Sequence, residues 1–318
     1  MRVYTDLGAL PETARSVAIG TFDGVHAGHQ KVITTAVEEA RNRGLHSTVL
    51  TFAGHPLSLL EPGRKPRLLT PLGTKIRLIS ALGPDELLVL QFDRSLADMS
   101  PQLFCRHVLA RDMGAKLVVV GANFTYGARG KGTAGTLHEC GEQLGFDVIV
   151  VPLVSGDGRT ISSTLIRSLL AKGALEEVRA VLGRPPSAAG RVVRGLQRGR
   201  SLGVPTANLD VEADTIFPGR GVYAARALVD GHWYRTAVNV GENPTFHRRD
   251  EETTVVHIEA FLLGFAGDLY DRQIKVDFLH KIREELRFDK VSDLVAQMER
   301  DIRATADIVD PEFTAVGL

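Results

Sequence analysis

Residues 19–33, IGTFDGVHAGHQKVI, join a short apolar run to an amphipathic stretch through a glycine-rich turn with two histidines. The apolar run is typical of a buried strand. Apolar residues at helical spacing follow Gly28, namely Val32, Ile33, Ala36, Val37 and Ala40. We therefore predict a strand that ends near Gly20 and a helix that follows Gly28 and stops at Gly44.

The same alternation of β-rich runs and helical patterns continues through the first half of the chain. The runs are SVAIG (16–20), STVLTF (47–52), ELLVLQF (86–92), KLVVVGANF (116–124) and DVIVVPLV (147–154). One intervening helix is expected to open at Ser100-Pro101 and to point Leu103, Phe104, Val108 and Leu109 inward. Two more are expected over 161–173 and 174–184. This order predicts an α/β, Rossmann-like domain with a parallel sheet covered on both faces.

The sequence pattern changes at residues 183–187, GRPPS, which cannot continue a helix. We therefore expect domains at 1–183 and 184–318. Strand-like runs dominate the second, over 222–229, 232–241, 253–263 and 274–282, and Asp230-Gly231 favours a hairpin between the first two. An antiparallel barrel or sandwich is expected, followed by a helix over about 291–308 that packs through Leu294, Val295, Met298 and Ile302.

The composition excludes several classes of protein. Lys plus Arg equals Asp plus Glu at 38 each in 318 residues, so the broad positive field of a nucleic-acid-binding protein is missing. Cys105 and Cys140 form no CxxC pair, which argues against a disulfide framework and a cysteine zinc site. No signal peptide or membrane span is evident, so we expect a cytoplasmic protein without a nucleic-acid or membrane partner. The oligomeric state stays open.

The turn at residues 20–29 follows a strand of a parallel sheet, at the edge where such sheets bind ligands. Unpaired N–H groups of the next helix, together with Gly20, Gly24 and Gly28, favour a phosphate there, and His26 and His29 would complete an anion clamp. A lone HxxH is more often a surface or capping pair. A zinc site is disfavoured because HxxH lacks the spacing of HExxH and no third ligand is evident.

Other motifs carry less weight. Residues 130–135, GKGTAG, match GxGxxG but begin well past the preceding strand, which disfavours a dinucleotide site. The chain has no GxxxxGK[ST] and no GxSxG, so a P-loop kinase and a serine-elbow hydrolase are not supported.

The sequence resembles the nucleotidylyltransferase superfamily in two places, HAGH at 26–29 and ISSTLIR at 161–167. The resemblance implies an ATP site in which both histidines are catalytic and contact the phosphates. The phosphate-binding residues would be Gly20, Phe22, Asp23, Gly24, Gly28, Ser162, Ser163, Thr164 and Arg167. Helix capping by Ser162 and Ser163 is compatible with this role.

The second half adds QRGRSLGVPTANLD (197–210), NVGENPTF (239–246) and a segment beginning HIEAF at 257. With them the whole chain resembles the bifunctional riboflavin kinase/FAD synthetases. The resemblance implies that the barrel phosphorylates riboflavin to FMN and that the first domain joins FMN to AMP from ATP, giving FAD and pyrophosphate.

The resemblance also implies individual roles. Thr206 and Asn208 would hold Mg²⁺ and the nucleotide, and the nucleotide phosphates would be covered by Gly199, Arg200 and Gly203. Glu259 would be the general base. Without the resemblance, Glu259 is interpreted as a solvated strand residue. In the first domain, Asn123 and Phe124 would border the flavin. The chain departs from the family pattern at Gly54 and Thr160, and Arg159 lies beside the latter. Two rivals are a flavin-storage protein and a nucleotidylyltransferase with another acceptor.

Overall fold

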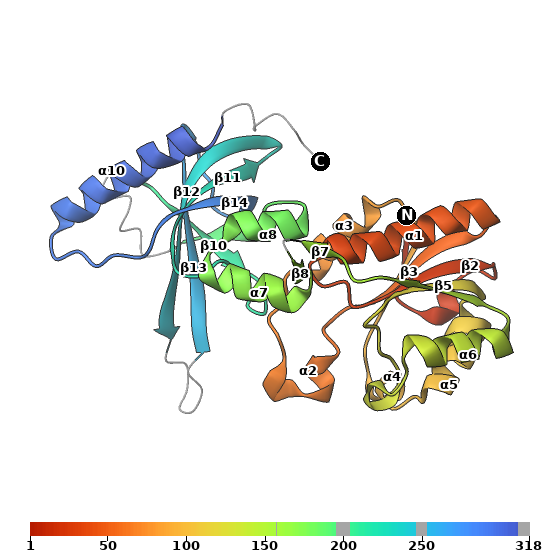
Figure 1. The fold of residues 1–318 in the computed structure, drawn as a ribbon. Helices are drawn as coiled ribbons and strands as arrows, with labels where there is room; N and C mark the ends of the chain where they lie inside the picture. Colours follow the sequence, from red (N-terminus) through yellow and green to blue (C-terminus); the bar gives the residue numbers. More distant parts are fainter. Residues whose placement is uncertain (157, 195–203, 246–252, 311–318) are drawn as a thin grey trace. The chain divides into compact units, whose positions relative to one another are not determined.

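The computed structural model of the chain describes residues 1–156, 158–194, 204–245 and 253–310. The described chain divides into two compact units, Met1–Ser163 and Thr164–Leu318 (Figure 1). Each unit has its own architecture. The boundary falls after Ser163, the first residue of α7 (Ser163–Lys172). The rest of α7 and all of α8 (Leu175–Leu182) therefore belong to the second unit. The expected domains, 1–183 and 184–318, stay a prediction.

The first unit contains a six-stranded parallel sheet with the order β1-β4-β3-β2-β5-β6. Its strands are β1 (Arg2–Tyr4), β2 (Arg15–Ile19), β3 (His46–Phe52), β4 (Glu86–Leu90), β5 (Ala115–Gly121) and β6 (Asp147–Val151). The predicted parallel sheet is confirmed, with the unforeseen β1 at one edge. From β2 the chain proceeds to β3 and β4 on one side and later to β5 and β6 on the other. The strand order therefore reverses between β2 and β5.

Helices cover both faces of this sheet, as predicted. α1 (Ala27–Arg43) and α3 (Leu72–Ser80) pack on Ala18, Val49, Leu87 and Val119, while η3 (Phe104–Asp112, a π-helix) and α6 (Ala134–Leu144) pack on Val17, Leu50, Leu88 and Val118. Neighbouring positions of one strand point to opposite faces, which explains the split. The short elements are η1 (Leu7–Ala9), α2 (Leu57–Leu60), η2 (Pro62–Arg64), α4 (Arg94–Ala97), α5 (Pro101–Leu103), η4 (Ala128–Gly130), β7 (Ser155–Gly156) and β8 (Arg159–Thr160).

Two helix starts refine the predictions. α1 begins at Ala27, before Gly28, because the His26 ring caps it by accepting from the His29 N–H at 3.4 Å, and it ends at Gly44 with φ 64°. Ser100 caps α5 as expected, through a 3.2 Å bond from the Leu103 N–H. The predicted burial of Leu103 is wrong, since this side chain is 45% exposed. A residue next to Phe104 on a helix points about 100° away from it, toward solvent.

The second unit contains a closed antiparallel barrel with the order β10-β13-β12-β11-β14-β9, which decides between the expected barrel and sandwich. Its strands are β9 (Ser187–Val193), β10 (Ala207–Val211), β11 (Gly221–Val229), β12 (His232–Thr245), β13 (Thr253–Leu262) and β14 (Gln273–Arg283). The predicted hairpin is confirmed. Asp230 and Gly231 turn between β11 and β12 with φ values of 47° and 84°.

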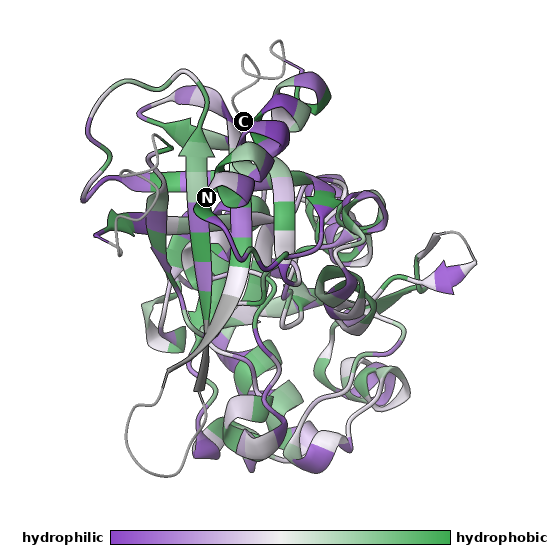
Figure 2. Ribbon diagram, turned by 90° about the vertical axis from the view of Figure 1, so that its left-hand side faces the viewer, coloured by the Kyte–Doolittle hydropathy of each residue, from purple (hydrophilic) through white to green (hydrophobic). Residues whose placement is uncertain are grey.

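The last helix, α10 (Val291–Ile308), packs on β11, β12 and β14. The predicted apolar face, Leu294, Val295, Met298 and Ile302, is half-buried, and Figure 2 shows both hydrophobic and hydrophilic segments along the helix. Its buried polar contact is an ion pair of Arg283 with Asp301 at 2.7 Å. No helix among the described residues has both the length and the hydropathy to cross a membrane.

A buried ion pair joins the amino ends of the central strands. Arg15 Nε lies 2.7 Å from Glu86 Oε2, and the two side chains are 1% and 3% exposed. Its other guanidinium nitrogens donate to the carbonyls of Pro11, Thr13 and Met113. The pair therefore ties β2 and β4 to the segments before β2 and β5.

We predict that Glu86→Gln destabilises the chain by about 3 kcal/mol, because it leaves the Arg15 charge buried without its carboxylate. Urea denaturation followed by circular dichroism measures the loss. Arg43→Gln is the matched control, since it breaks exposed pairs with Glu39 and Asp147 and should cost less than about 1 kcal/mol. Equal losses in the two variants would contradict the proposed weight of the buried pair.

Candidate active sites

The loop after β2 has an unusual backbone. Phe22 and Val25 have φ values of 48° and 42°, and Gly24 has 90°. The first two are non-glycine residues in the left-handed region, where L side chains are strained, and both are buried. Such strain persists only where the surrounding structure holds the loop firmly.

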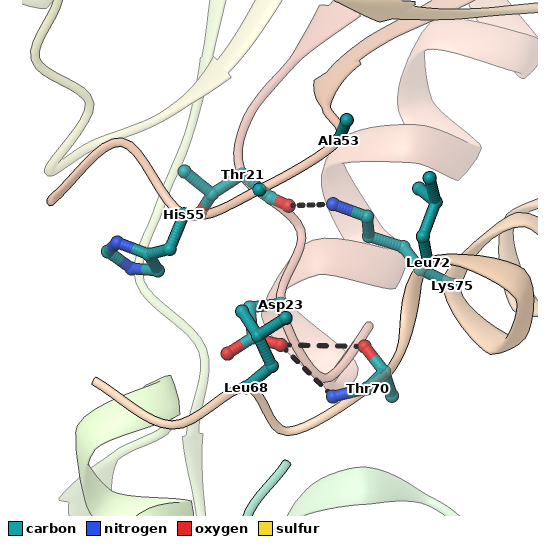
Figure 3. Close-up of a pocket in the computed structure, with 9 residues that line it drawn as sticks. Thr21, Asp23, Ala53, His55, Leu68, Thr70, Leu72 and Lys75 are labelled. Atoms are coloured by element: carbon teal, nitrogen blue, oxygen red, sulfur yellow. Dashed lines mark hydrogen bonds between the residues drawn. The ribbon is translucent and has the colours of Figure 1, made fainter. Parts of the chain in front are cut away.

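Asp23 provides much of that hold. Its buried carboxylate accepts the Leu69 N–H at 2.9 Å and the Thr70 N–H at 3.1 Å, and the bond to Thr70 is drawn in Figure 3. Thr70 Oγ1 accepts the Gly24 N–H at 3.1 Å. The hydroxyl of Ser163 donates to the Asp23 carbonyl at 3.0 Å. Ser163, from the second motif, therefore lies against the loop of the first. The Asp23 carboxylate holds neighbouring backbone, and the predicted phosphate role of Asp23 and Ser163 stays a prediction.

The two imidazoles are stacked, with ring centroids 3.6 Å apart and planes 20° apart. His26 is 5% exposed, and because its Nδ1 accepts the His29 N–H, a neutral His26 carries its proton on Nε2. Phe22 packs its ring edgewise on His29 at 5.4 Å. His29 Nδ1 is buried and has no hydrogen-bond partner among the described residues. A buried polar atom of this kind is suited to a ligand.

The pKa of His29 lies well below its ordinary value of 6.5. Burial is the largest cause, followed by the nearby His26 and by the positive charge of Lys75. All three disfavour the imidazolium. His29 is therefore neutral at pH 7 in the free site.

The glycines of the motif make room for rings. A Cβ at Gly20 would lie 2.8 Å from Phe22 Cε1, and a Cβ at Gly28 would lie 3.2 Å from His26 Cε1. At Gly24 the φ value of 90° and Leu69 Cδ1 at 2.8 Å both oppose a side chain. The lack of side chains at these glycines therefore makes room for Phe22, His26 and Leu69, in addition to any room that it leaves for a phosphate.

Asn123 and Phe124 follow β5, the parallel neighbour of β2, so they lie at the same edge of the sheet as the histidine loop. Asn123 is exposed, and half-buried Phe124 stacks on Tyr126 with centroids 5.5 Å apart. The strand order reverses between these two strands, which is where open α/β sheets form ligand crevices. Their predicted place beside the flavin stays a prediction.

The ISSTLIR motif spans the division between the units. Ser162 is half-buried at the end of the first unit, and Thr164 and Arg167 lie in the first two turns of α7 in the second. Among the departures from the family pattern, Gly54 has open space where a Cβ would lie, and Thr160 pairs with Ser155 in β7–β8. Their effects stay untested, as do those of Arg159.

Sequence reasoning missed a small pocket between the loops that follow β2 and β3. Its lining includes Thr21, Asp23, His55, Thr70 and Lys75, and its volume is about 240 Å³ including its opening to solvent (Figure 3). Lys75 contributes from α3, far along the chain from the histidines. The apolar spacing of that helix gave no signal for a buried ammonium.

The barrel brings together a row of polar residues. Glu259 on β13 lies directly across from Asn208 on β10 and from Asn239 on β12. Its neighbours Ile258 and Ala260 are 1% and 0% exposed, so Glu259 points to the outer face, where directly paired residues have Cβ atoms about 5 Å apart. Asn239 is the first residue of the segment 239–246 that carries the resemblance, but no role was predicted for it. Thr206 is half-buried just before β10, and Gly199, Arg200 and Gly203 lie outside the described residues.

The parallel sheet with its stacked histidines and the barrel with its outward carboxylate define a nucleotidyltransferase-type domain followed by a small kinase-type barrel. The family model for FAD synthetase matches residues 11–165, and that for riboflavin kinase matches residues 182–309. The chain therefore belongs to the bifunctional riboflavin kinases/FMN adenylyltransferases, with the adenylyltransferase domain first and the kinase domain second.

Individual relatives agree with this assignment. The bifunctional riboflavin kinase/FMN adenylyltransferase of Bacillus subtilis (strain 168) is 38% identical over 292 residues, 91% of each chain. The protein of that name from Escherichia coli (strain K12) is 36% identical over 302 residues, 95% of each chain. A crystal structure described as a macrolide-efflux protein from Streptococcus pneumoniae superposes with a TM-score of 0.86 and 32% identity, over 96% of this chain and 99% of that one.

Two glycines at the same position of two helices allow a matched test. Gly28 and Gly135 are each the second residue of their helix, α1 and α6. Alanine at 28 would press on the His26 ring at 3.2 Å, whereas alanine at 135 meets only Thr133 Oγ1 at 3.6 Å, an ordinary contact. We expect Gly28→Ala to slow FAD formation from FMN at least about ten-fold, because it would displace the His26 ring, which is predicted to be catalytic, and catalytic groups tolerate little displacement. Gly135→Ala should leave the rate unchanged, and equal rates would refute the steric argument.

Proposed function

We propose that the two sites act in series on one flavin. The barrel transfers the γ-phosphoryl group of ATP to riboflavin, and the crevice of the sheet then joins the resulting FMN to AMP from a second ATP. The proposal is supported by two arrangements, the stacked His26 and His29 with Ser163 against their loop, and the pairing of Glu259 with Asn208 on the outer face of the barrel.

In the adenylyl transfer, an oxygen of the FMN phosphate attacks the α-phosphorus of ATP, and the bond to the β-phosphate breaks to release pyrophosphate. No covalent enzyme intermediate is needed, so the protein positions the phosphates and stabilises developing charge. His26 donates through Nε2–H, and His29, neutral in the free site, offers its unpartnered Nδ1 side to the bound nucleotide. The strained loop contributes backbone N–H groups at the start of α1.

In the kinase reaction, Glu259 accepts the proton of the riboflavin 5′-hydroxyl. The hydroxyl oxygen then attacks the γ-phosphorus, and ADP leaves. Asn208, directly across from Glu259, brings the nucleotide side of the site within one strand spacing of the base. Asn239 flanks the carboxylate on its other side.

Thr206 and Asn208 fit Mg²⁺ by the chemistry of their donors, a hydroxyl and an amide oxygen. Among the described residues no cluster of three His, Cys, Asp or Glu side chains could hold a metal. A bound Mg²⁺ ion would take one or two protein oxygens here and draw its other ligands from phosphates and water. When bound, the ion neutralises charge on the transferred phosphoryl group.

Two other functions make different predictions. A flavin-storage protein would bind riboflavin unchanged, and a nucleotidylyltransferase for another acceptor would leave FMN unmodified. Incubation with riboflavin, ATP and Mg²⁺, followed by chromatography of the flavins, distinguishes the three. We expect FMN first and FAD later, and unaltered riboflavin would overturn the proposal.

Single substitutions should separate the activities. We expect His29→Ala to lower FAD formation from FMN by about 10²-fold or more, as for the loss of a preorganised polar group, while FMN formation persists. Glu259→Gln should lower FMN formation by about 10²-fold or more and spare FAD formation from supplied FMN. Initial rates with each flavin measure both. Parallel loss of both activities in either variant would contradict two independent sites.

A further inference from the structure

Lys75 occupies an unusual position for an ammonium group. Lys75 is only 6% exposed, and its Nζ donates to the carbonyls of Thr21 at 3.1 Å and Phe52 at 2.7 Å. Figure 3 shows the side chain reaching from α3 to Thr21 along one wall of the pocket. Thr21 lies in the histidine loop after β2, and Phe52 is the last residue of β3. One ammonium thus joins the ends of two neighbouring strands.

The contacts alone do not require a charge. An uncharged amide could donate to the same two carbonyls at a smaller cost of burial. Burial lowers the pKa of Lys75 to about 8, and the negative charge of Asp23 acts in the opposite direction. The ammonium form therefore predominates at pH 7, and its positive charge contributes to the lowered pKa of His29.

We propose that Lys75 is a positioning residue for adenylyl transfer, which holds the histidine loop through the Thr21 carbonyl and presents a fixed positive charge beside the phosphate site. The inference rests on the proposed role of that site. The charge attracts the triphosphate, and it disfavours a competing imidazolium on His29 before the nucleotide binds.

The groups that face Lys75 come from three elements. Asp23 belongs to the loop after β2, His29 to α1, and His55 to the loop after β3, where it lines the same pocket. On α3 itself, Arg77 is exposed. Asp23 favours the ammonium and His29 is neutral, so the loss of activity at high pH should follow Lys75.

The test compares Lys75→Met and Lys75→Arg in the full chain. At pH 7 we expect Lys75→Met to lower kcat/KM for ATP in FAD formation by about ten-fold or more, with riboflavin phosphorylation within two-fold of wild type. For the wild-type chain, kcat/KM should fall as pH rises through about 8, because the active ammonium form is lost above its pKa. Lys75→Arg should keep activity beyond pH 9, and Lys75→Met should lack this fall.

Lys116→Met is the control, since Lys116 is an exposed lysine near the amino end of β5. It should leave both activities and both pH profiles unchanged. A folded Lys75→Met with wild-type kcat/KM, or a Lys75→Arg whose activity falls at the wild-type pH, would overturn the inference. A wild-type chain that makes FMN but no FAD would instead refute the proposed role of the crevice.

Discussion

A buried carboxylate holds the loop on which the first site depends. Asp23 accepts two backbone N–H groups from residues 69 and 70, and such bonds to a charged group are worth more than those between neutral partners. The loop contains two strained non-glycine residues, each costing of order 1–3 kcal/mol. Thr70, Lys75 and Ser163 add further bonds from separate segments. The conformation of the loop therefore depends on contacts from other segments of the folded domain. These contacts also determine where the stacked imidazoles lie.

This arrangement also sets the charge of the site. The chain as a whole is neutral, so the two proposed phosphate sites depend on local groups. Three influences lower the pKa of His29, and burial is the largest. A neutral imidazole can sit against another imidazole at 3.6 Å without repulsion between like charges. In the proposed site, positive charge comes instead from Lys75, a buried lysine whose ammonium donates to two carbonyls.

The sequence predicts the classes of element well, because these depend on local patterns, whereas the roles of the site residues stay predictions. The spacing of apolar residues determines α1, and its five predicted core residues are buried. Lys75 and the partners of Asp23 could not be predicted, since they meet the loop only after the strands have paired. β1 was missed because it has three residues and pairs at the sheet edge with a strand far along the chain. The exposed Leu103 shows that a local apolar pattern does not determine which side of a turn faces the core.

The barrel explains why the sequence could not distinguish two interpretations of Glu259, a catalytic base and a solvated strand residue. The interior of a six-stranded barrel is filled by side chains, here including Ile258, Ala260 and Val238, so the polar row of Asn208, Glu259 and Asn239 has to lie outside. A solvated strand residue and a catalytic base would therefore point the same way. Register adds support for the proposed base, because it places Glu259 directly across from Asn208 and Asn239, and the catalytic role itself stays a prediction. Alternation along one strand predicts only the direction of a side chain, whereas its neighbours depend on how three strands align.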